Sequence, residues 1–235
     1  GDVYKRQVQE RAVGQLNISC SVASGKYVLP LIATRFRQRF PDVQISIFPC
    51  ASKDVTRRLL EEKADLALVS SELEDPTFES QTLFFDTIQL IVPPEHDWAR
   101  RGRISAAELL EEEIIMREPS SGSRKVLLTE LAKYDISYDD LNILLEIGNA
   151  EGIVTAVAAG CGISFVSQKV IEDAVALGRV KVVEIDDWLI TRRVYMVRRA
   201  YQSLQRVTEA FWSFVHDPSN QDILSQQKSL SSEHF

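Results

Sequence analysis

Between about Gly14 and Val215 the sequence alternates short apolar runs with longer segments that have the apolar spacing of helices. The run 43–48 alternates apolar and polar residues like a half-buried strand, whereas 26–40 has the periodicity of an amphipathic helix. Strands that alternate with helices of about ten or more residues indicate βαβ units and mostly parallel sheets. The pattern therefore predicts an α/β fold.

The predicted elements follow one another closely. We expect strands at 16–20, 43–48, 65–69, 87–92, 113–116, 143–147, 163–166, 180–185 and 194–197. We expect helices at 26–40, 53–62, 124–134, 150–159, 168–177 and 203–215, and a short helix after the capping-box pattern that begins at Ser105. In such a fold each strand's carboxyl end leads into the amino end of a helix, and ligands bind at that edge. The loops expected there are 21–25, 49–52, 117–123 and 147–149.

Charge argues against nucleic-acid binding by this chain alone. The net charge is -7, and phosphate contacts need clustered lysine and arginine. Four arginine pairs, most of them with acidic neighbours, are interpreted as solvated faces: 57–58, 100–101, 192–193 and 198–199.

The cysteines and the chain start indicate a cytoplasmic protein. Cys20, Cys50 and Cys161 are widely spaced, which suggests neither a disulfide framework nor a metal site, and we interpret them as small apolar fillers. Residues 1–11 lack the apolar segment of a signal peptide, and no apolar run approaches the roughly 20 residues that span a bilayer. No membrane partner is expected.

Small polar residues precede several of the predicted helices. Each is a good N-cap, so plain capping explains any one of them. Taken together they suggest an anion site, because helix starts carry unpaired N–H groups and a positive partial charge. A small anionic or zwitterionic ligand is then expected near Ser21, Ser24, Ser52, Ser120, Ser121, Ser123 and Asn149.

Arg124 stands at the start of a predicted helix, where the helix dipole disfavours a cation. Its position suggests a carboxylate partner, supplied by the protein or by a ligand. A surface ion pair with Glu118 or Glu151 explains the residue equally well.

The sequence gives little support to an enzyme. Its three histidines are His96, His216 and His234, and the last two lie near or in the tail. No HExxH, GxSxG, GxGxxG or P-loop motif is present. We therefore expect no catalytic residues, no metal site and no cofactor, and we interpret the acidic run 111–113 as a solvated turn.

Five segments in order resemble the effector domain of LysR-type transcriptional regulators. They lie at 14–41, at 52–68 with its Asp-Leu-Ala strand, at His96, at Ser120-Ser-Gly-Ser-Arg124 and at Val157-Ala-Ala-Gly-Cys-Gly-Ile163. The resemblance covers about 14–215, nearly all of the chain expected to be ordered. One departure is Glu62, which stands where the family usually has glycine, and it should change a turn and not the fold.

The resemblance implies two Rossmann-like lobes joined by two crossing strands, as in type 2 periplasmic binding proteins. Residues 14–91 and 196–217 would form lobe I and 92–195 lobe II, with 1–13 the end of a linker helix. Composition marks 218–235 as a disordered tail. The effector contacts that the resemblance and the helix starts suggest are Ser21, Ala23, Ser24, Ser52, Ser121, Ser123, Arg124 and Asn149.

The function expected from these observations is ligand sensing that controls transcription. The effector would be a small anion, the domain would form homodimers or tetramers, and DNA would be bound only through an N-terminal domain that this chain lacks. A solute-binding protein of a transport system is the alternative, and the absence of a signal peptide and the cysteines argue against it. The residues do not identify the effector or say whether the regulator activates or represses.

Overall fold

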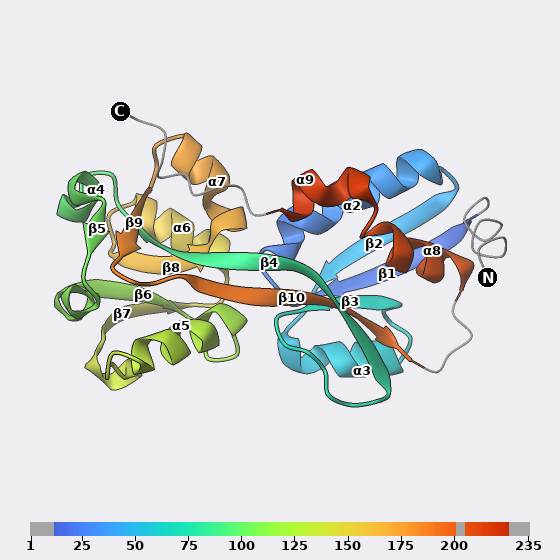
Figure 1. Ribbon diagram of the computed structural model, residues 1–235, viewed down its shortest axis with the longest axis horizontal. Coiled ribbons are helices and arrows are strands. Elements are labelled where there is room, and N and C mark those ends of the chain that lie inside the picture. Colours follow the sequence, from blue (N-terminus) through green and yellow to red (C-terminus); the bar gives the residue numbers. More distant parts are fainter. Residues whose placement is uncertain (1–11, 201–204, 226–235) are drawn as a thin grey trace. The chain divides into compact units, whose positions relative to one another are not determined.

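The chain forms two α/β units in the computed structural model, which describes residues 12–200 and 205–225. Unit 1 contains the chain up to Phe85 and again from Arg193, and unit 2 contains Asp86–Arg192. Two strands, β4 (Phe78–Val92) and β10 (Ile190–Arg199), pass from one unit into the other (Figure 1). The resemblance implies divisions a few residues later, after 91 and 195.

Unit 1 has the strand order β2-β1-β3-β10, in which β1, β2 and β3 are parallel and β10 is antiparallel to β3. Only the three strands of the βαβ repeat follow the predicted parallel arrangement. The elements of this unit besides β4 and β10 are β1 (Gly14–Cys20), α2 (Gly25–Arg39), β2 (Val43–Pro49), η1 (Ser52–Asp54), α3 (Val55–Leu60), β3 (Leu66–Val69), α8 (Arg206–Phe214), η4 (Pro218–Asn220) and α9 (Gln221–Leu224).

Two apolar clusters hold unit 1 together, one on each face of the sheet. Phe36 of α2 is fully buried, and its ring centroid lies 5.0 Å from that of Phe211 and 5.2 Å from that of Phe214 in α8. On the other face, Val55 and Leu59 of α3 pack against β3. Figure 1 shows α2 and α3 on opposite sides of these strands. The apolar stripe predicted for 26–40 is therefore the buried face of α2.

Unit 2 has the strand order β4-β8-β6-β7, and β9 pairs with both β4 and β5. Strands β6, β7 and β8 are parallel, whereas β4 is antiparallel to β8 and β9. Its other elements are α4 (Asp97–Arg101), β5 (Arg103–Ile104), η2 (Ala106–Glu111), β6 (Glu113–Arg117), α5 (Gly122–Ala132), η3 (Tyr138–Asp140), β7 (Asn142–Ile147), α6 (Ala150–Ala158), β8 (Ile163–Ser167), α7 (Gln168–Ala176) and β9 (Lys181–Ile185).

Close backbone approach fixes the entry into β8. Gly162 has φ 145°, and a Cβ there would lie 2.6 Å from the carbonyl oxygen of Glu113 in β6. No other residue fits this position without a shift of the backbone. The Gly-Cys-Gly turn that marks the resemblance is therefore needed for the packing of β8 beside β6.

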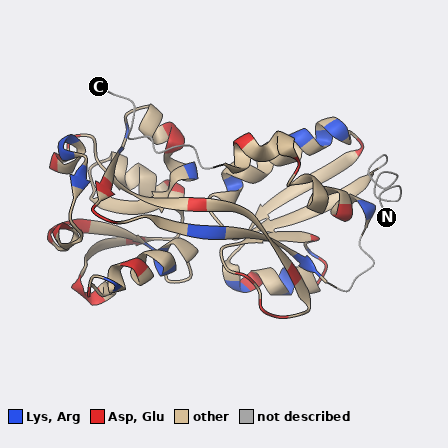
Figure 2. Cartoon of the chain, in the orientation of Figure 1, with Lys and Arg blue, Asp and Glu red and all other residues tan. Residues whose placement is uncertain are grey.

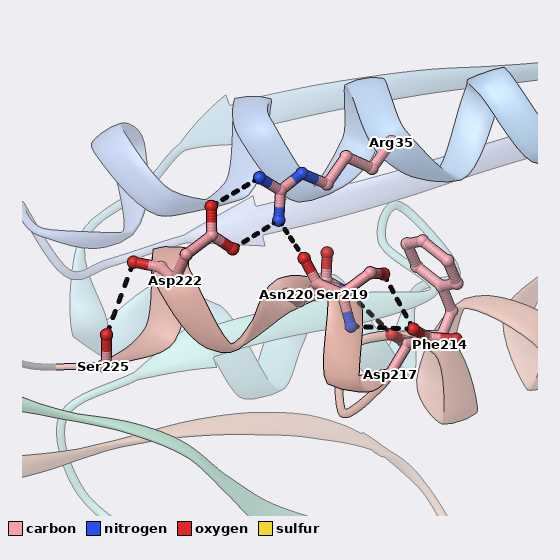
Figure 3. A network of polar contacts seen from close by, with 7 residues as sticks. All are labelled: Arg35, Phe214, Asp217, Ser219, Asn220, Asp222 and Ser225. Carbon is pink, nitrogen blue, oxygen red and sulfur yellow. Dashed lines mark hydrogen bonds and ion pairs between the residues drawn. The ribbon is translucent and has the colours of Figure 1, made fainter.

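The prediction of a disordered tail from 218 is wrong for residues 218–225. Asn220 is fully buried and its Nδ2 donates to the carbonyl of Phe214 at 2.8 Å. Both nitrogens at the end of the Arg35 side chain donate to the Asp222 carboxylate at 2.6 Å (Figure 3). Polar composition did not predict this order, because a few specific contacts hold the segment and no apolar pattern marks it. The prediction for 226–235 lies outside the described residues, as does that for 1–11.

One strand and one helix differ from the predicted bounds. Strand β4 begins at Phe78 instead of Thr87, and helix 53–62 is a 3-10 turn followed by the short α3. Glu62 has φ 57°, in the left-handed region that favours glycine, which agrees with the glycine that the resemblance leads us to expect there.

Candidate functional site

The loops that follow β1 and β2 leave unit 1 from one edge. Cys20 pairs with Pro49 in the β1–β2 register and with Leu68 in the β1–β3 register, so the three carboxyl ends are level. The N–H of Cys50 donates to the Cys20 carbonyl at 3.0 Å. Ser21, Ala23 and Ser24 on the first loop and Ser52 after the second therefore share this edge, as predicted for such loops.

Ser24 has an unusual environment for a hydroxyl. It is fully buried at the N-cap of α2, a helix of 15 residues, and it makes no side-chain capping bond. Its Oγ has no hydrogen-bond partner among the residues that the structure describes. Buried hydroxyls are rarely left unpaired, because water lost on burial must be replaced by another partner.

The backbone around Ser24 is tightly packed. A Cβ at Gly25 would lie 2.5 Å from the Cys20 sulfur, so α2 begins against β1 at a distance that only glycine allows. The N–H groups of Gly25, Lys26 and Tyr27 already donate to carbonyls of the preceding turn, at 3.1 Å each. The expectation that these amides are unpaired is therefore wrong for α2. The hydroxyl and the helix dipole are the remaining features that would attract an anion there.

The other unit 1 positions have less specific environments. The Ser21 hydroxyl and N–H both donate to the Leu68 carbonyl at 3.0 Å, so this serine fastens the loop to β3. Ala23 is half-buried, and Ser52 is exposed at the start of η1.

A second set of loops leaves one edge of unit 2. Arg117 at the end of β6 pairs with Ile147 at the end of β7, and β8 is parallel to both through its pairing with β6. The loops 118–121 and 148–149 thus begin side by side, as the sequence predicted. Polar side chains from each loop reach the same edge.

The start of α5 keeps the features of an anion site. Ser121 at its N-cap and Ser123 in its first turn are buried, and Ser121 makes no capping bond. Within the described residues, the N–H groups of Gly122, Ser123 and Arg124 donate to no acceptor. Unpaired N–H groups at the positive end of a helix dipole favour an anion.

Arg124 has partners within unit 2, but neither of the two glutamates expected. Its Nη1 donates to Glu146 Oε2 at 2.6 Å and to the Arg117 carbonyl at 2.8 Å. The guanidinium also lies 4.4 Å from the centroid of the Tyr138 ring. These contacts explain a half-buried cation at this helix start without a ligand, while its contact with an effector stays a prediction.

Asn149 is an N-cap of α6. Its Oδ1 accepts from the N–H of Gly152 at 2.6 Å, and a Cβ at Gly152 would lie 2.8 Å from that oxygen. Capping therefore accounts for the side-chain oxygen of Asn149. An anionic effector would accept a hydrogen bond from the side-chain nitrogen.

The sequence did not predict the buried ion pair of Asp86 and Arg192. Arg192 donates to Asp86 Oδ2 at 2.8 and 3.0 Å, and the Asp86 and Arg192 side chains are 0% and 4% exposed. The Ser167 hydroxyl donates to Asp86 Oδ1 at 2.6 Å and makes no capping bond to α7, although Ser167 stands at the N-cap of that helix. Only the rarity of buried charges hints at such a pair, and burial could not be read from a sequence.

The interpretation of the arginine pairs as solvated faces is wrong in two places. Arg192 is buried, and the Arg198 side chain is 11% exposed with its guanidinium 4.3 Å from the Trp212 ring centroid. Elsewhere Figure 2 shows basic and acidic residues interspersed along the helices of each unit.

The cysteines have three different environments. Cys20 is buried as predicted, and burial raises the pKa of the half-buried Cys50 thiol. The prediction is wrong for Cys161, which is exposed because it lies in the turn after α6.

The described residues offer neither a metal site nor a helix that could span a membrane. No group of three or more histidine, cysteine or acidic side chains there could hold a metal ion. None of the described helices combines the length and apolarity needed to cross a bilayer.

A family model described as the LysR substrate binding domain matches residues 9–218. This chain belongs to that family. Among curated relatives of this LysR domain, the HTH-type transcriptional regulator MJ0300 of Methanocaldococcus jannaschii is 30% identical over 210 residues, covering 89% of this chain and 71% of the relative. The regulator CbbR of Sinorhizobium medicae is 30% identical over 194 residues, covering 83% of this chain and 61% of its own length.

Solved structures agree with this assignment. The CcmR regulatory domain of Synechocystis PCC6803, in complex with 2-PG, has a TM-score of 0.77 and 26% identity over 86% of this chain and 95% of that domain. The effector binding domain of QuiR, in complex with shikimate, has a TM-score of 0.76 at 22% identity, over 87% of this chain and 96% of that domain, and supports the fold alone. The predicted fold, similar to type 2 periplasmic binding proteins, is confirmed.

Proposed function

We propose that this LysR domain binds a small anion at a serine-bearing helix start, at α2 in unit 1 or at α5 in unit 2, and so regulates transcription. The observation that carries the proposal is Ser24, a buried hydroxyl at a helix start that has no partner within the described residues. A carboxylate, phosphate or sulfate oxygen would accept a hydrogen bond from this hydroxyl. The start of α5 would supply N–H groups to the same class of ligand.

Relatives support a small-molecule effector. CcmR, which is 26% identical to this chain, is solved with 2-PG bound. The named curated relatives are transcriptional regulators, which leaves the transport alternative without support and favours a domain that senses over one that catalyses. We propose that the complete protein binds DNA through a domain outside this chain and acts in the cytoplasm.

A second copy of the chain is the proposed partner. Strand β7 is at the end of the unit 2 strand order, and Leu144 and Leu145 on it are 42% and 43% exposed. The pairing of β6 with β7 shifts register between Ile114 and Ile115, and this irregularity accompanies the exposure of two consecutive leucines on β7. An exposed apolar edge strand is a common pairing surface, and we assign this one to self-association.

Thermal denaturation against a ligand panel tests the proposal. The panel contains sulfate, dicarboxylates, phosphorylated acids and amino-acid derivatives, with their uncharged methyl esters or alcohols as controls. An effector present at about 100 times its dissociation constant should stabilise the fold by about 2.7 kcal/mol. If no anion raises the melting temperature more than its neutral control does, the proposal fails.

A further inference from the structure

Unit 2 contains a pocket of about 660 Å³ that includes none of the residues proposed for the effector. It lies where β9 parts from β4. The two strands pair from Leu90 to Val92, after which Glu184 and Ile185 of β9 pair with β5 instead. Thr87 to Gln89 of β4, the end of β9 and the turn that begins β10 then surround the space.

The walls of this pocket are largely apolar. Strand side chains from the unit 2 core line it, including Ile88, Leu90, Phe165 and Ile185. Trp188 lines it from the turn, with its ring centroid 6.4 Å from that of Phe165 and 5.2 Å from that of Tyr134. Its volume lies within the range of about 300 to 1,000 Å³ that small-molecule sites have.

Two buried polar atoms in this lining lack partners. Gln89 Oε1, an acceptor, and Trp188 Nε1, a donor, make no hydrogen bond to any residue in the described part of the chain. Burial without a hydrogen bond is unfavourable for both atoms, because each has lost its water. A ligand that offers one donor and one acceptor would satisfy both.

The charges at the pocket do not favour an anion. Arg103 is the basic side chain of the lining, and its guanidinium is already paired with Glu184 at 2.7 Å and Asp186 at 3.6 Å. Asp187 adds a further negative charge to the lining. A neutral molecule therefore fits this pocket, in contrast to the anion proposed for the helix starts.

We propose that this pocket is a second ligand site, which binds a neutral, mostly apolar molecule carrying a hydrogen-bond acceptor and a donor. Its acceptor accepts a hydrogen bond from the Trp188 indole N–H, and its N–H or O–H donates to Gln89 Oε1. The apolar remainder lies against Ile88, Phe165 and Ile185. An aromatic carboxamide has this chemistry.

Benzamide is the probe, and the indole N–H signals of the uniformly 15N-labelled protein are the readout. Of the three tryptophans, only Trp188 lines the pocket, whereas Trp98 and Trp212 are buried in the cores. Benzamide should move the Trp188 signal saturably below about 10 mM and leave the other two in place. Toluene, which lacks both polar groups, and benzoate, which is charged, should bind at least about tenfold more weakly.

Variants separate the two polar atoms. Trp188→Phe removes the donor and keeps an aromatic ring, and Gln89→Met removes the acceptor at similar size. Each should weaken benzamide binding, followed by calorimetry, on the order of tenfold. Gln44→Met, at an exposed position on β2 of unit 1, is the matched control and should have no effect.

The wild-type titration needs no variant to fold and decides the proposal by itself. No movement of the Trp188 signal, equal movement of all three signals, or binding of toluene as tight as that of benzamide would overturn it. Benzamide is uncharged, so this result is independent of whether anions bind at the helix starts.

Discussion

Serines at helix starts have three different environments in this chain. Ser105 forms the capping box expected from its sequence, with Glu108 Oε2 accepting from its N–H at 2.9 Å. Ser167 instead donates to Asp86, and Ser24 has no partner among the described residues. Capping patterns within four residues can be read from a sequence. The partner of Ser167 lies 81 positions away, and tertiary structure alone brings it there.

The buried pair of Asp86 and Arg192 gives a prediction for stability. Asp86→Leu alone leaves a buried guanidinium without its carboxylate and should cost about 3–5 kcal/mol. The double variant Asp86→Leu with Arg192→Met removes both charges and should recover most of that loss. Urea denaturation followed by circular dichroism measures both. A double variant as unstable as Asp86→Leu would contradict this account of the pair.

Gly25 gives a second prediction, for packing at the start of α2. Gly25→Ala places a methyl group 2.5 Å from the Cys20 sulfur and should destabilise the fold by about 1–3 kcal/mol. Adding Cys20→Ala makes space and should reverse part of this loss. The same denaturation assay applies, with Gly148→Ala as the control because a Cβ there meets nothing within 4 Å.

At the scale of elements, periodicity predicted where strands and helices lie better than where they end. The buried face of α2 and the carboxyl-edge loops follow from the apolar pattern. The first half of β4 does not follow from this pattern, because residues such as Glu79 and Gln81 interrupt the alternation of apolar and polar residues. The short α9 was missed because one ion pair and one buried residue, Ile223, hold it.

The contact between α2 and α9 should depend on pH. The hydrogen bond from Arg35 holds the pKa of Asp222 at about 2, below its unfolded value of about 3.9. A lowered folded pKa means that this stabilisation is complete above about pH 4 and is lost as the pH falls toward 2. Amide hydrogen exchange at 221–224, relative to α2, should therefore rise over that window.

Asp222→Asn is the matched variant for this measurement. Exchange in its α9 should be fast already at neutral pH and should not change further between about pH 4 and 2. Wild-type protection of α9 that persists unchanged at pH 2 would show that the ion pair does not hold this helix.

At the scale of the whole molecule, the family assignment rests on motifs that the fold explains. Gly162 allows β8 to approach β6, and Glu62 has a left-handed backbone, which favours glycine. The resemblance therefore predicted the fold class. It did not predict which polar atoms would be left without partners, because that depends on side-chain directions.

Self-association through β7 gives a prediction at this scale. Leu145→Glu places a charge on the exposed edge strand and should shift a dimer toward monomer. Leu177→Glu changes an equally apolar residue, 73% exposed and away from that strand, and should leave the mass unchanged. Light scattering after size exclusion measures both masses. A wild-type monomer at all concentrations would contradict the proposed interface.

Calorimetry of the anion that most raises the melting temperature, with Ser24→Ala beside the wild type, tests the central claim most directly. Losing a hydrogen bond to a charged group should weaken binding about ten- to a hundredfold. Without ligand, Ser24→Ala should be as stable as the wild type or more so, because it removes a buried hydroxyl that has no partner among the described residues. Ser213→Ala, on an exposed position of α8, should change neither quantity. Unchanged affinity in Ser24→Ala would contradict the account.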